Sequence, residues 1–492
     1  MKKMLICLAA VAVMLLTAGC SQEPDRPEAG TPEVVAPEPV TSLRRVVTAD
    51  QLAALDREYP DLAELDLRGS DCPAEIAAYA AAHPAVAVRY DADLGGTRCD
   101  SDAAALTLED GSYRFDALAE GLAYLPALRE LMLPRTALTA DQLALLRETY
   151  PTLALRFTVE LAGRELSSDD TELDLTALTE AELDEAAAAL EKLPGLERIA
   201  LGALPLSAAV RIRAAAPQAA LDYTFTLFGQ TLTADAEHVE YYAAPIGNEG
   251  VAAVRDMLDV MNGLTYLKLE KCGVDSEILA QLRDDYPQTK IVWRVNFGTY
   301  FSCLTDEEMI RAIFELHDDD VSELKYCTDV KYMDIGHNEE LHDISFIACM
   351  PKLEICILSG SPTTDLSPFA NCPNLELLEC VYCCFIPDVS ALENCTKLKY
   401  LNLSYSQVKD LSPLYDLPLE RFVYYDSGLS EAEQQAMRDA HPDCWVNFSG
   451  LNPYVLGWRY DDQGYTWCDM YKHVRAVFNY EVNYYNHEEP RG

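Results

Sequence analysis

Basic residues are scarce in this chain of 492 residues. It carries 38 lysines and arginines against 81 aspartates and glutamates, so its formal net charge is −43 at pH 7. So large an excess of negative charge repels phosphate backbones and anionic lipid headgroups. We therefore predict that the protein binds no nucleic acid and does not attach to membranes through its folded surface.

Catalytic and metal-binding motifs are also lacking. There is no phosphate-binding loop and no G-x-S-x-G sequence. Cys468 and His473 lie five residues apart on a predicted helix, where about 500° of rotation separates them. His337 and His342 lack the spacing of a zinc helix, and the Cys-x-x-Cys pair that starts at Cys380 has no second pair. We predict no catalytic residue, no metal ion and no cofactor.

Long apolar runs are confined to the N-terminal segment that ends at Cys20, which has the order of a signal peptide. Two lysines precede an apolar run from Met4 to Leu16, and Leu16-Thr-Ala-Gly-Cys20 follows. The last five residues resemble a bacterial lipobox, which implies cleavage before Cys20 and acylation of that cysteine. Loss of the two lysines would take the net charge from −43 to −45. We expect an exported protein, lipid-anchored to the outer face of the cell membrane.

A stretch rich in proline and glutamate follows, over residues 21–46. Such a composition cannot bury a core and stays extended. It is predicted to be a linker that holds the folded part away from the membrane.

Aliphatic residues return at a fixed period in the C-terminal half. The period is set by Leu353, Leu375, Leu398 and Leu419, and by Asp343, Asp365, Asp388 and Asp410. A period of about 22 residues indicates one supersecondary unit per repeat, stacked into a solenoid. The motifs Asp365-Leu-Ser-Pro-Phe369 and Asp410-Leu-Ser-Pro-Leu414 make this region resemble leucine-rich repeats of the internalin type. That resemblance implies a binding scaffold.

A longer period precedes it. Prolines 84, 151, 217 and 287 are nearly evenly spaced, and each is followed by an alternating strand that ends near a glycine. Alternation into glycine predicts a hairpin. Capping boxes at Thr48, Thr139 and Ser430 predict helix starts. The predicted unit is helix, strand, hairpin, strand, helix, strand.

Together these patterns predict an α/β fold of the leucine-rich-repeat solenoid type. Its degenerate helix–strand repeats of about 67 residues occupy 47–300, and regular repeats of about 22 residues occupy 301–450. Residues 451–492 are rich in tyrosine and hold a predicted helix from Thr466 to Phe478 with an apolar face. Because the last coil of a solenoid must be covered, we predict that they form a C-terminal cap. The alternative is an aromatic patch that binds a partner.

Fourteen cysteines remain outside the signal peptide and Cys20, since the chain has 16 and Cys7 lies in the signal. Four of them, Cys327, Cys349, Cys372 and Cys395, recur at the repeat period. We expect them to form a buried ladder of free thiols, because small apolar side chains suit a tight repeated turn.

The binding face follows from the repeat. Alternate strand residues point away from the core, so relative positions 3, 5, 7 and 8 of each unit lie on the concave face. Exposed aromatic side chains on a rigid surface are typical of recognition sites. The predicted ligand-binding residues are Glu379, Tyr382, Tyr400, Asn402, Tyr405, Arg421, Tyr425 and Asp426.

The function predicted from these patterns is recognition of an extracellular protein or glycan by a monomeric, surface-exposed binding protein that makes no bonds. The alternatives are a structural cell-envelope protein without a saturable ligand, and an enzyme whose site is assembled between repeats.

Overall fold

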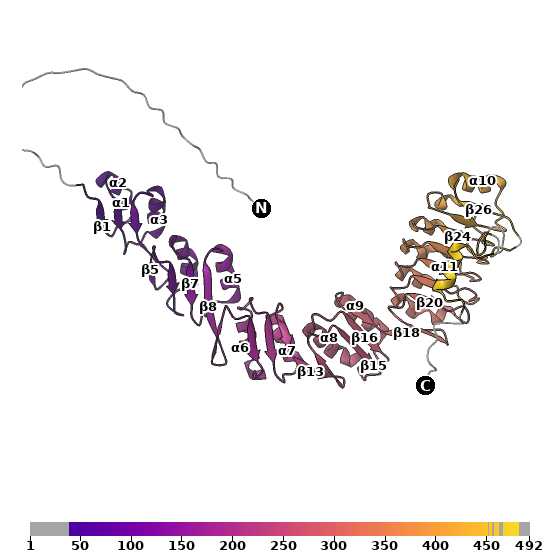
Figure 1. Ribbon diagram of the computed structural model, residues 1–492, viewed down its shortest axis with the longest axis horizontal. Coiled ribbons are helices and arrows are strands. Elements are labelled where there is room, and N and C mark those ends of the chain that lie inside the picture. Colours follow the sequence, from indigo (N-terminus) through magenta and orange to yellow (C-terminus); the bar gives the residue numbers. More distant parts are fainter. Residues whose placement is uncertain (1–38, 451, 455–456, 462–465, 482–492) are drawn as a thin grey trace, which may run out of the picture. The chain divides into compact units, whose positions relative to one another are not determined.

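The computed structural model describes residues 39–450, 452–454, 457–461 and 466–481 (Figure 1). The predicted signal peptide, Cys20 and most of the predicted linker lie outside these residues. The chain divides into two compact units, Met1–Glu130 and Leu131–Gly492. Among the residues that the structure describes, none of the helices combines the length and the apolar composition of a membrane span.

The first unit opens with a three-stranded parallel sheet in the order β1-β2-β3. Its elements are β1 (Ser42–Arg44), α1 (Ala49–Leu52), α2 (Leu55–Glu58), β2 (Glu64–Asp66), α3 (Pro73–Ala82), β3 (Ala87–Arg89), β4 (Asp91–Asp93), β5 (Arg98–Asp100), β6 (Ala105–Thr107) and α4 (Phe115–Gly121). Leu55, Leu65 and Ile76 are almost fully buried in its core. Since β1 begins at Ser42, the folded part starts inside the stretch 21–46 that we assigned to the linker, and that boundary is corrected.

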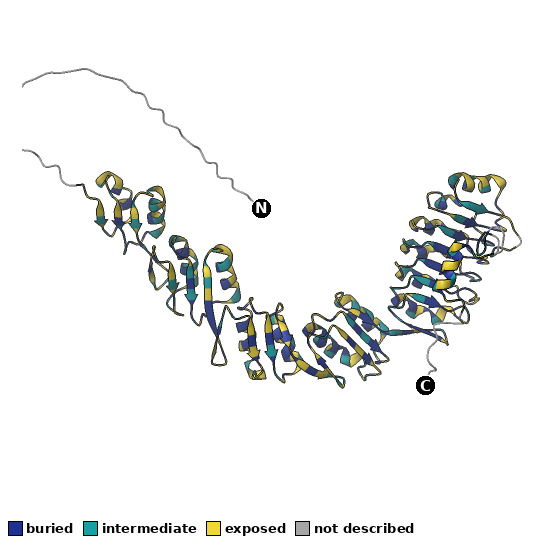
Figure 2. Cartoon of the chain, in the orientation of Figure 1, coloured by how far each residue is buried: buried dark blue, intermediate teal, exposed yellow. Residues whose placement is uncertain are grey.

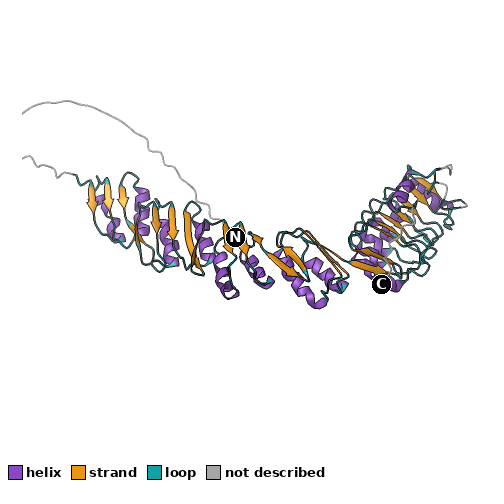
Figure 3. Ribbon diagram, turned by 60° about the horizontal axis from the view of Figure 1, so that its bottom comes forward, coloured by secondary structure: helices purple, strands orange, loops and turns teal. Residues whose placement is uncertain are grey.

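The second unit begins with larger α/β repeats. Their elements are β7 (Glu130–Leu133, which starts at the division), α5 (Ala140–Thr149), β8 (Ala154–Leu161), β9 (Arg164–Ser167), β10 (Glu172–Leu175), α6 (Leu183–Leu190), β11 (Arg198–Leu201), α7 (Leu206–Ala215), β12 (Ala220–Asp222), β13 (Thr224–Leu227), β14 (Gln230–Thr233), β15 (His238–Tyr242), α8 (Val251–Val260), β16 (Tyr266–Glu270), α9 (Ser276–Asp285), β17 (Lys290–Val292), β18 (Arg294–Phe297) and β19 (Phe301–Leu304). Two parallel sheets, β10-β11-β12 and β15-β16-β17, are each followed by an antiparallel hairpin. Figure 3 shows helices alternating with strands in these repeats.

Local chemistry explains these elements. The Thr139 hydroxyl accepts the Gln142 N–H, and the Gln142 side chain accepts the Thr139 N–H, so both ends of a capping box are satisfied at the start of α5. The helix ends at Thr149, and its C-cap Tyr150 precedes a proline, where α geometry is disfavoured. The hairpins turn at glycines with positive φ, such as Gly229 at 82°.

The regular repeats form one parallel sheet of seven strands in chain order. The strands are β20 (Met309–Arg311), β21 (Tyr332–Asp334), β22 (Ile355–Ile357), β23 (Leu377–Glu379), β24 (Tyr400–Asn402), β25 (Arg421–Val423) and β26 (Trp445–Asn447). Short 3-10 helices return the chain between β20 and β25, at 322–326, 345–349, 367–371, 390–394 and 412–414, and α10 (Glu431–Ala440) precedes β26. Because each strand pairs in parallel with the strand of the next repeat, in the same register, this part of the chain is a repeat solenoid.

The aspartates that recur at the repeat period lie just before the 3-10 helices. Each carboxylate accepts the N–H of the serine two residues later, at 2.8 Å for Ser345, 2.7 Å for Ser367, 3.0 Å for Ser390 and 2.9 Å for Ser412. This Asx turn satisfies one backbone donor at each helix start. The repeated D-x-S sequence therefore serves the turn.

The register lines up side chains in two columns on the open sheet face. One column is mostly apolar and is called the apolar column; it consists of Tyr332, Ile355, Leu377, Tyr400 and Arg421. The other is mostly polar and is called the polar column; it consists of Arg311, Asp334, Ile357, Glu379, Asn402 and Val423. Both columns point away from the interior of the coils, because alternate strand residues face opposite sides.

The described residues between 452 and 481, which we call the strap, lie along these columns. The strap holds α11 (Asp469–Val477), drawn yellow in front of the repeats in Figure 1. Tyr471, Val474 and Phe478 are buried against Ile355 and Leu377. The prediction was that residues 451–492 cover the open end of the last coil. The described part of this range covers the sheet face instead, and the rest of it lies outside the described residues.

The cysteine ladder also differs from its prediction. All fourteen described cysteines are free, and Cys327, Cys372 and Cys395 are buried at the ends of their 3-10 helices, as predicted. In the repeat between Cys327 and Cys372, the fully buried Met350 takes this position, and Cys349 is exposed. Because neighbouring repeats differ in length by one residue, a strictly constant period misses the position, and a shift of one residue turns a side chain outward.

Candidate functional site

The strap is held to the polar column by side chains that are themselves buried. Glu379 is completely buried, and its carboxylate accepts bonds from the Trp458 indole N–H, from Arg459 at 2.6 Å and from the Ser359 hydroxyl at 2.9 Å. The Arg459 guanidinium lies over the ring of Tyr454 at 4.2 Å. A buried carboxylate needs such partners, because an unpaired one would be strongly unfavourable.

The same column contacts the strap at both ends. The Tyr480 hydroxyl donates to the Asp334 carboxylate at 2.6 Å, and Arg311 lies over the Tyr480 ring at 4.6 Å. The Asn402 amide donates to the Pro453 carbonyl at 3.1 Å. Burial raises the pKa of the Asp334 carboxyl, and burial together with Asp334 raises the pKa of Tyr480. The strap is therefore bound by hydrogen bonds along the sheet as well as by apolar contact.

Three of the predicted binding residues lie beneath the strap or its approach. Glu379 and Asn402 are completely buried and Tyr425 is 3% exposed, with its hydroxyl accepting from the Asn447 amide at 3.1 Å. The prediction that these side chains are open to a ligand is wrong, because the chain's own C-terminal segment occupies the surface. The amphipathic helix at 466–478 and the apolar residues Ile355 and Ile357 on the outward face were the sequence signals for this cover.

Two further predicted residues are partly covered. Arg421 donates to the Gly457 carbonyl at 2.6 Å and lies over the Trp445 ring at 5.5 Å. The Tyr400 hydroxyl donates to Glu420 at 2.8 Å, and its ring is half-buried. Arg421 thus holds the strap, whereas Tyr400 keeps an accessible side.

The remaining three lie at the turns that follow the strands, where the Tyr382 ring also meets Tyr454 of the strap with ring centroids 6.1 Å apart. Tyr382 is 45% exposed and stacks on Tyr405 with ring centroids 4.4 Å apart and planes 9° apart. Phe385, in the turn after Tyr382, is 56% exposed, and Asp426 is also exposed. We call Tyr382, Phe385 and Tyr405 the tyrosine edge.

Both tyrosines of this edge occupy a left-handed backbone position, with φ of 60° at Tyr382 and 69° at Tyr405. The same position holds Gly360 in the preceding repeat and Asp426 in the following one, also with positive φ. A bulky residue there is less stable than glycine by about 1–2 kcal/mol. The two rings are therefore carried at turns where glycine would be the more stable choice.

A cleft of about 500 Å³ remains between α11 and the beginnings of four strands. We call it the helix–sheet cleft. Its sheet wall is formed by Tyr332, Ile355, Leu377 and Tyr400, and Met470 and His473 line it from α11. This volume lies in the range of small-ligand sites, which is about 300–1,000 Å³. Figure 2 shows exposed residues on the outer side of α11.

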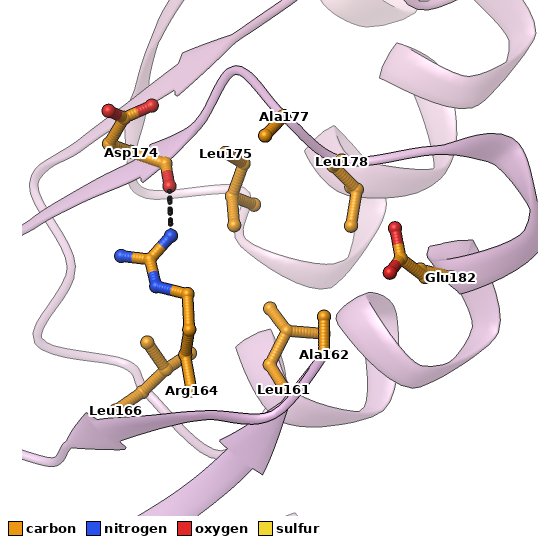
Figure 4. Close-up of a pocket in the computed structure, with 9 residues that line it drawn as sticks. All are labelled: Leu161, Ala162, Arg164, Leu166, Asp174, Leu175, Ala177, Leu178 and Glu182. Carbon is orange, nitrogen blue, oxygen red and sulfur yellow. Dashed lines mark hydrogen bonds between the residues drawn. The ribbon is translucent and has the colours of Figure 1, made fainter.

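A smaller cleft of about 210 Å³ lies beside the β8–β9 hairpin (Figure 4). The Arg164 guanidinium donates to the Asp174 carbonyl at 2.9 Å, and the Glu182 carboxylate accepts the Thr179 N–H at 2.9 Å. Leucines 161, 166, 175 and 178 form the rest of its lining. Its polar groups are hydrogen-bonded to nearby backbone groups. We therefore interpret this cleft as a packing gap between neighbouring repeats.

The side chains considered for chemistry are engaged in packing. The Cys468 thiol is buried and donates to the Trp458 carbonyl at 2.9 Å, and burial raises its pKa. His473 meets the Tyr332 ring edge-on at 6.4 Å. Burial also raises the pKa of Cys380. Across the described part of the chain, no three histidine, cysteine or carboxylate side chains are grouped to hold a metal ion.

Comparisons with known proteins return structural likenesses. An internalin from Listeria monocytogenes has 18% identity and a TM-score of 0.27, and the match covers 73% of this chain and 86% of that one. Internalin C2 from the same organism has 18% identity, 51% and 87% coverage and a TM-score of 0.24. A leucine-rich-repeat protein of Leptospira interrogans has 16% identity, 79% and 90% coverage and a TM-score of 0.27.

No protein-family profile matches the chain, and no curated protein matches it in sequence. The assignment as a repeat solenoid therefore rests on the strand register described above.

Proposed function

We propose that this protein is a lipid-anchored binding protein of the outer cell surface, which recognises an extracellular protein through the exposed parts of its leucine-rich repeats. Acylated Cys20 holds the chain at the membrane, and the proline-rich residues that follow give it reach. Recognition involves no bond making. The protein acts as a monomer.

The observation that carries this proposal is the tyrosine edge. Tyr382 and Phe385 remain about half exposed although the chain has a strap that covers the neighbouring sheet face. Rigid aromatic side chains lose little conformational freedom on binding and dominate interface energies. Their left-handed backbone, which glycine would adopt at lower free energy, supports a role outside folding.

The test replaces both rings by the residue that the turn prefers. Tyr382→Gly with Tyr405→Gly removes the aromatic surface and relieves the positive-φ strain, so the melting temperature should be kept or raised. The labelled protein is screened against arrays of extracellular proteins and glycans. We expect protein ligands that bind the natural chain and lose at least tenfold affinity for the variant.

Tyr300→Ala is the matched control, since Tyr300 is 50% exposed outside the tyrosine edge. Loss of binding in this control, or unchanged binding in the double glycine variant, would contradict the assignment of the edge. Glycan hits without protein hits would move the ligand to another class.

The anchor is tested separately. Cys20→Ala should release the protein from the membrane fraction, whereas Cys384→Ala, at an exposed cysteine of the repeats, should not. Membrane retention of the first variant would exclude acylation of Cys20 as the anchor.

A further inference from the structure

The helix–sheet cleft has the dimensions of a peptide site. Tyr332 and Tyr400 stand on strands β21 and β24, which are three strand spacings apart, or roughly 14 Å. An extended peptide covers that distance with about four residues. Because α11 forms the opposite wall, the peptide would lie between a sheet and a helix that are both held by the buried contacts of the strap.

The floor and walls of the cleft favour an aromatic side chain. Ile355 and Leu377 line the apolar floor together with Val474 of α11; they are only 4% and 2% exposed because the strap packs on them. Half-buried Tyr332 and Tyr400 stand at either end, and Met470 contributes a polarisable thioether from the helix. Aromatic rings gain from contacts with both kinds of neighbour.

The rim favours a cation. Three carboxylates line it, those of Glu354, Glu376 and Asp469. Lys399 lies 3.3 Å from Glu376, and Lys472 lies 2.7 Å from Asp469. Glu354 lies beside the Tyr332 ring, whose phenol pKa is raised by burial and by this carboxylate. The nearby Lys331 is paired with Glu308 at 2.8 Å, so Glu354 is the rim carboxylate without a lysine within salt-bridge distance among the described residues.

The chain itself carries an example of the chemistry that this sheet face accepts. Trp458 and Arg459 are consecutive, and both donate to the Glu379 carboxylate of the adjoining column. The arginine is also covered by the rings of Tyr454 and Tyr471, at 4.2 and 5.0 Å. The helix–sheet cleft offers the same set of groups, which are a carboxylate, tyrosine rings and an apolar floor, with no strap residue filling its volume.

We propose that the helix–sheet cleft binds a short extended segment of a partner protein that carries an aromatic residue next to an arginine. The aromatic ring lies on Ile355 and Leu377, and the guanidinium pairs with Glu354. The proposal rests on the proposed function in so far as the ligand is a protein, and it adds the chemical identity of the segment recognised.

The probe is the blocked tetrapeptide acetyl-Ala-Trp-Arg-Ala-amide, titrated into the full-length protein by calorimetry. We expect a dissociation constant of about 1 mM or tighter, and binding that weakens with added salt. Glu354→Gln should weaken it about three- to fivefold. Met470→Trp, which fills the cleft, should abolish it.

The controls decide between specific and general effects. Glu393→Gln removes an exposed carboxylate from a 3-10 helix outside the cleft and should leave the affinity unchanged. Acetyl-Ala-Trp-Glu-Ala-amide should bind at least tenfold more weakly than the arginine peptide. Circular dichroism and the melting temperature of each variant check that the fold is retained, with the strap packed on the sheet.

Equal affinity for the two peptides, no effect of Glu354→Gln, or no binding at about 1 mM would each overturn the proposal. A chito-oligosaccharide that binds and is blocked by Met470→Trp would also overturn it, because the ligand would then be a glycan. Since the variants of the tyrosine edge leave the cleft intact, failure here and failure of the proposed function are distinguishable.

Discussion

Arg459→Met breaks the buried charge pair that holds the strap. The Glu379 side chain is 0% exposed and that of Arg459 is 26% exposed. Removing one partner of a buried pair costs about 3–5 kcal/mol, because the other charge stays buried without compensation. Partial exposure of the arginine favours the lower end, about 3 kcal/mol. Methionine keeps most of the aliphatic volume, so the loss is mainly that of the cation.

The assay is native-state hydrogen exchange of the α11 amides, followed at Val474, whose side chain is fully buried. A loss of about 3 kcal/mol raises the population of the open strap roughly 100-fold, since about 1.4 kcal/mol is a factor of ten. The control is Lys472→Met on the same helix, where lysine and Asp469 form an exposed pair. Its effect should stay below about 1 kcal/mol, or roughly fivefold.

A double variant tests the cause. Arg459→Met with Glu379→Met leaves no orphaned charge and should recover part of the loss, although the Trp458 N–H and the Ser359 hydroxyl lose their acceptor. An unchanged hydrogen-exchange rate of the α11 amides in the single variant would refute the idea that the charge pair holds the strap on the sheet. Faster exchange in the double than in the single variant would refute the uncompensated carboxylate as the source of the loss.

Three further outcomes follow from the structure. Burial raises the pKa of the Tyr471 and Tyr480 phenols, so the unfolded chain ionises first and the free energy of unfolding should fall as pH rises above about 10, as measured by urea titration. Burial lowers the pKa of His441, so the unfolded chain takes up the proton first and the free energy of unfolding should fall as pH drops below about 6.5; His441→Gln should remove that slope. Brief alkylation of the native protein should modify the exposed Cys349 and Cys384 before the buried thiols, and mass spectrometry would show a different order if the repeat interior were open.

The repeat architecture could be predicted because its signals are local. Leu398 and Asp410 recur with their counterparts at one coil length, and each pair of neighbouring coils makes the same contacts. The same holds for the capping box at Thr139, which needs only residues within four positions. The burial of Cys349 was predicted wrongly, since successive repeats differ in length by one residue and a constant period does not determine which side chain points inward.

The state of the binding face depends on contacts that no short-range pattern records. Glu379 and Arg459 are 80 residues apart, and Asp334 and Tyr480 are 146 apart. Alternation along a strand determines which side chains leave the core of a coil. It does not determine whether a distant segment covers them. The sequence by itself thus determined a solenoid with an outward-facing sheet. Only the tertiary structure decided that the strap lies on this sheet, because burying two apolar surfaces against each other lowers the free energy whatever their separation along the chain.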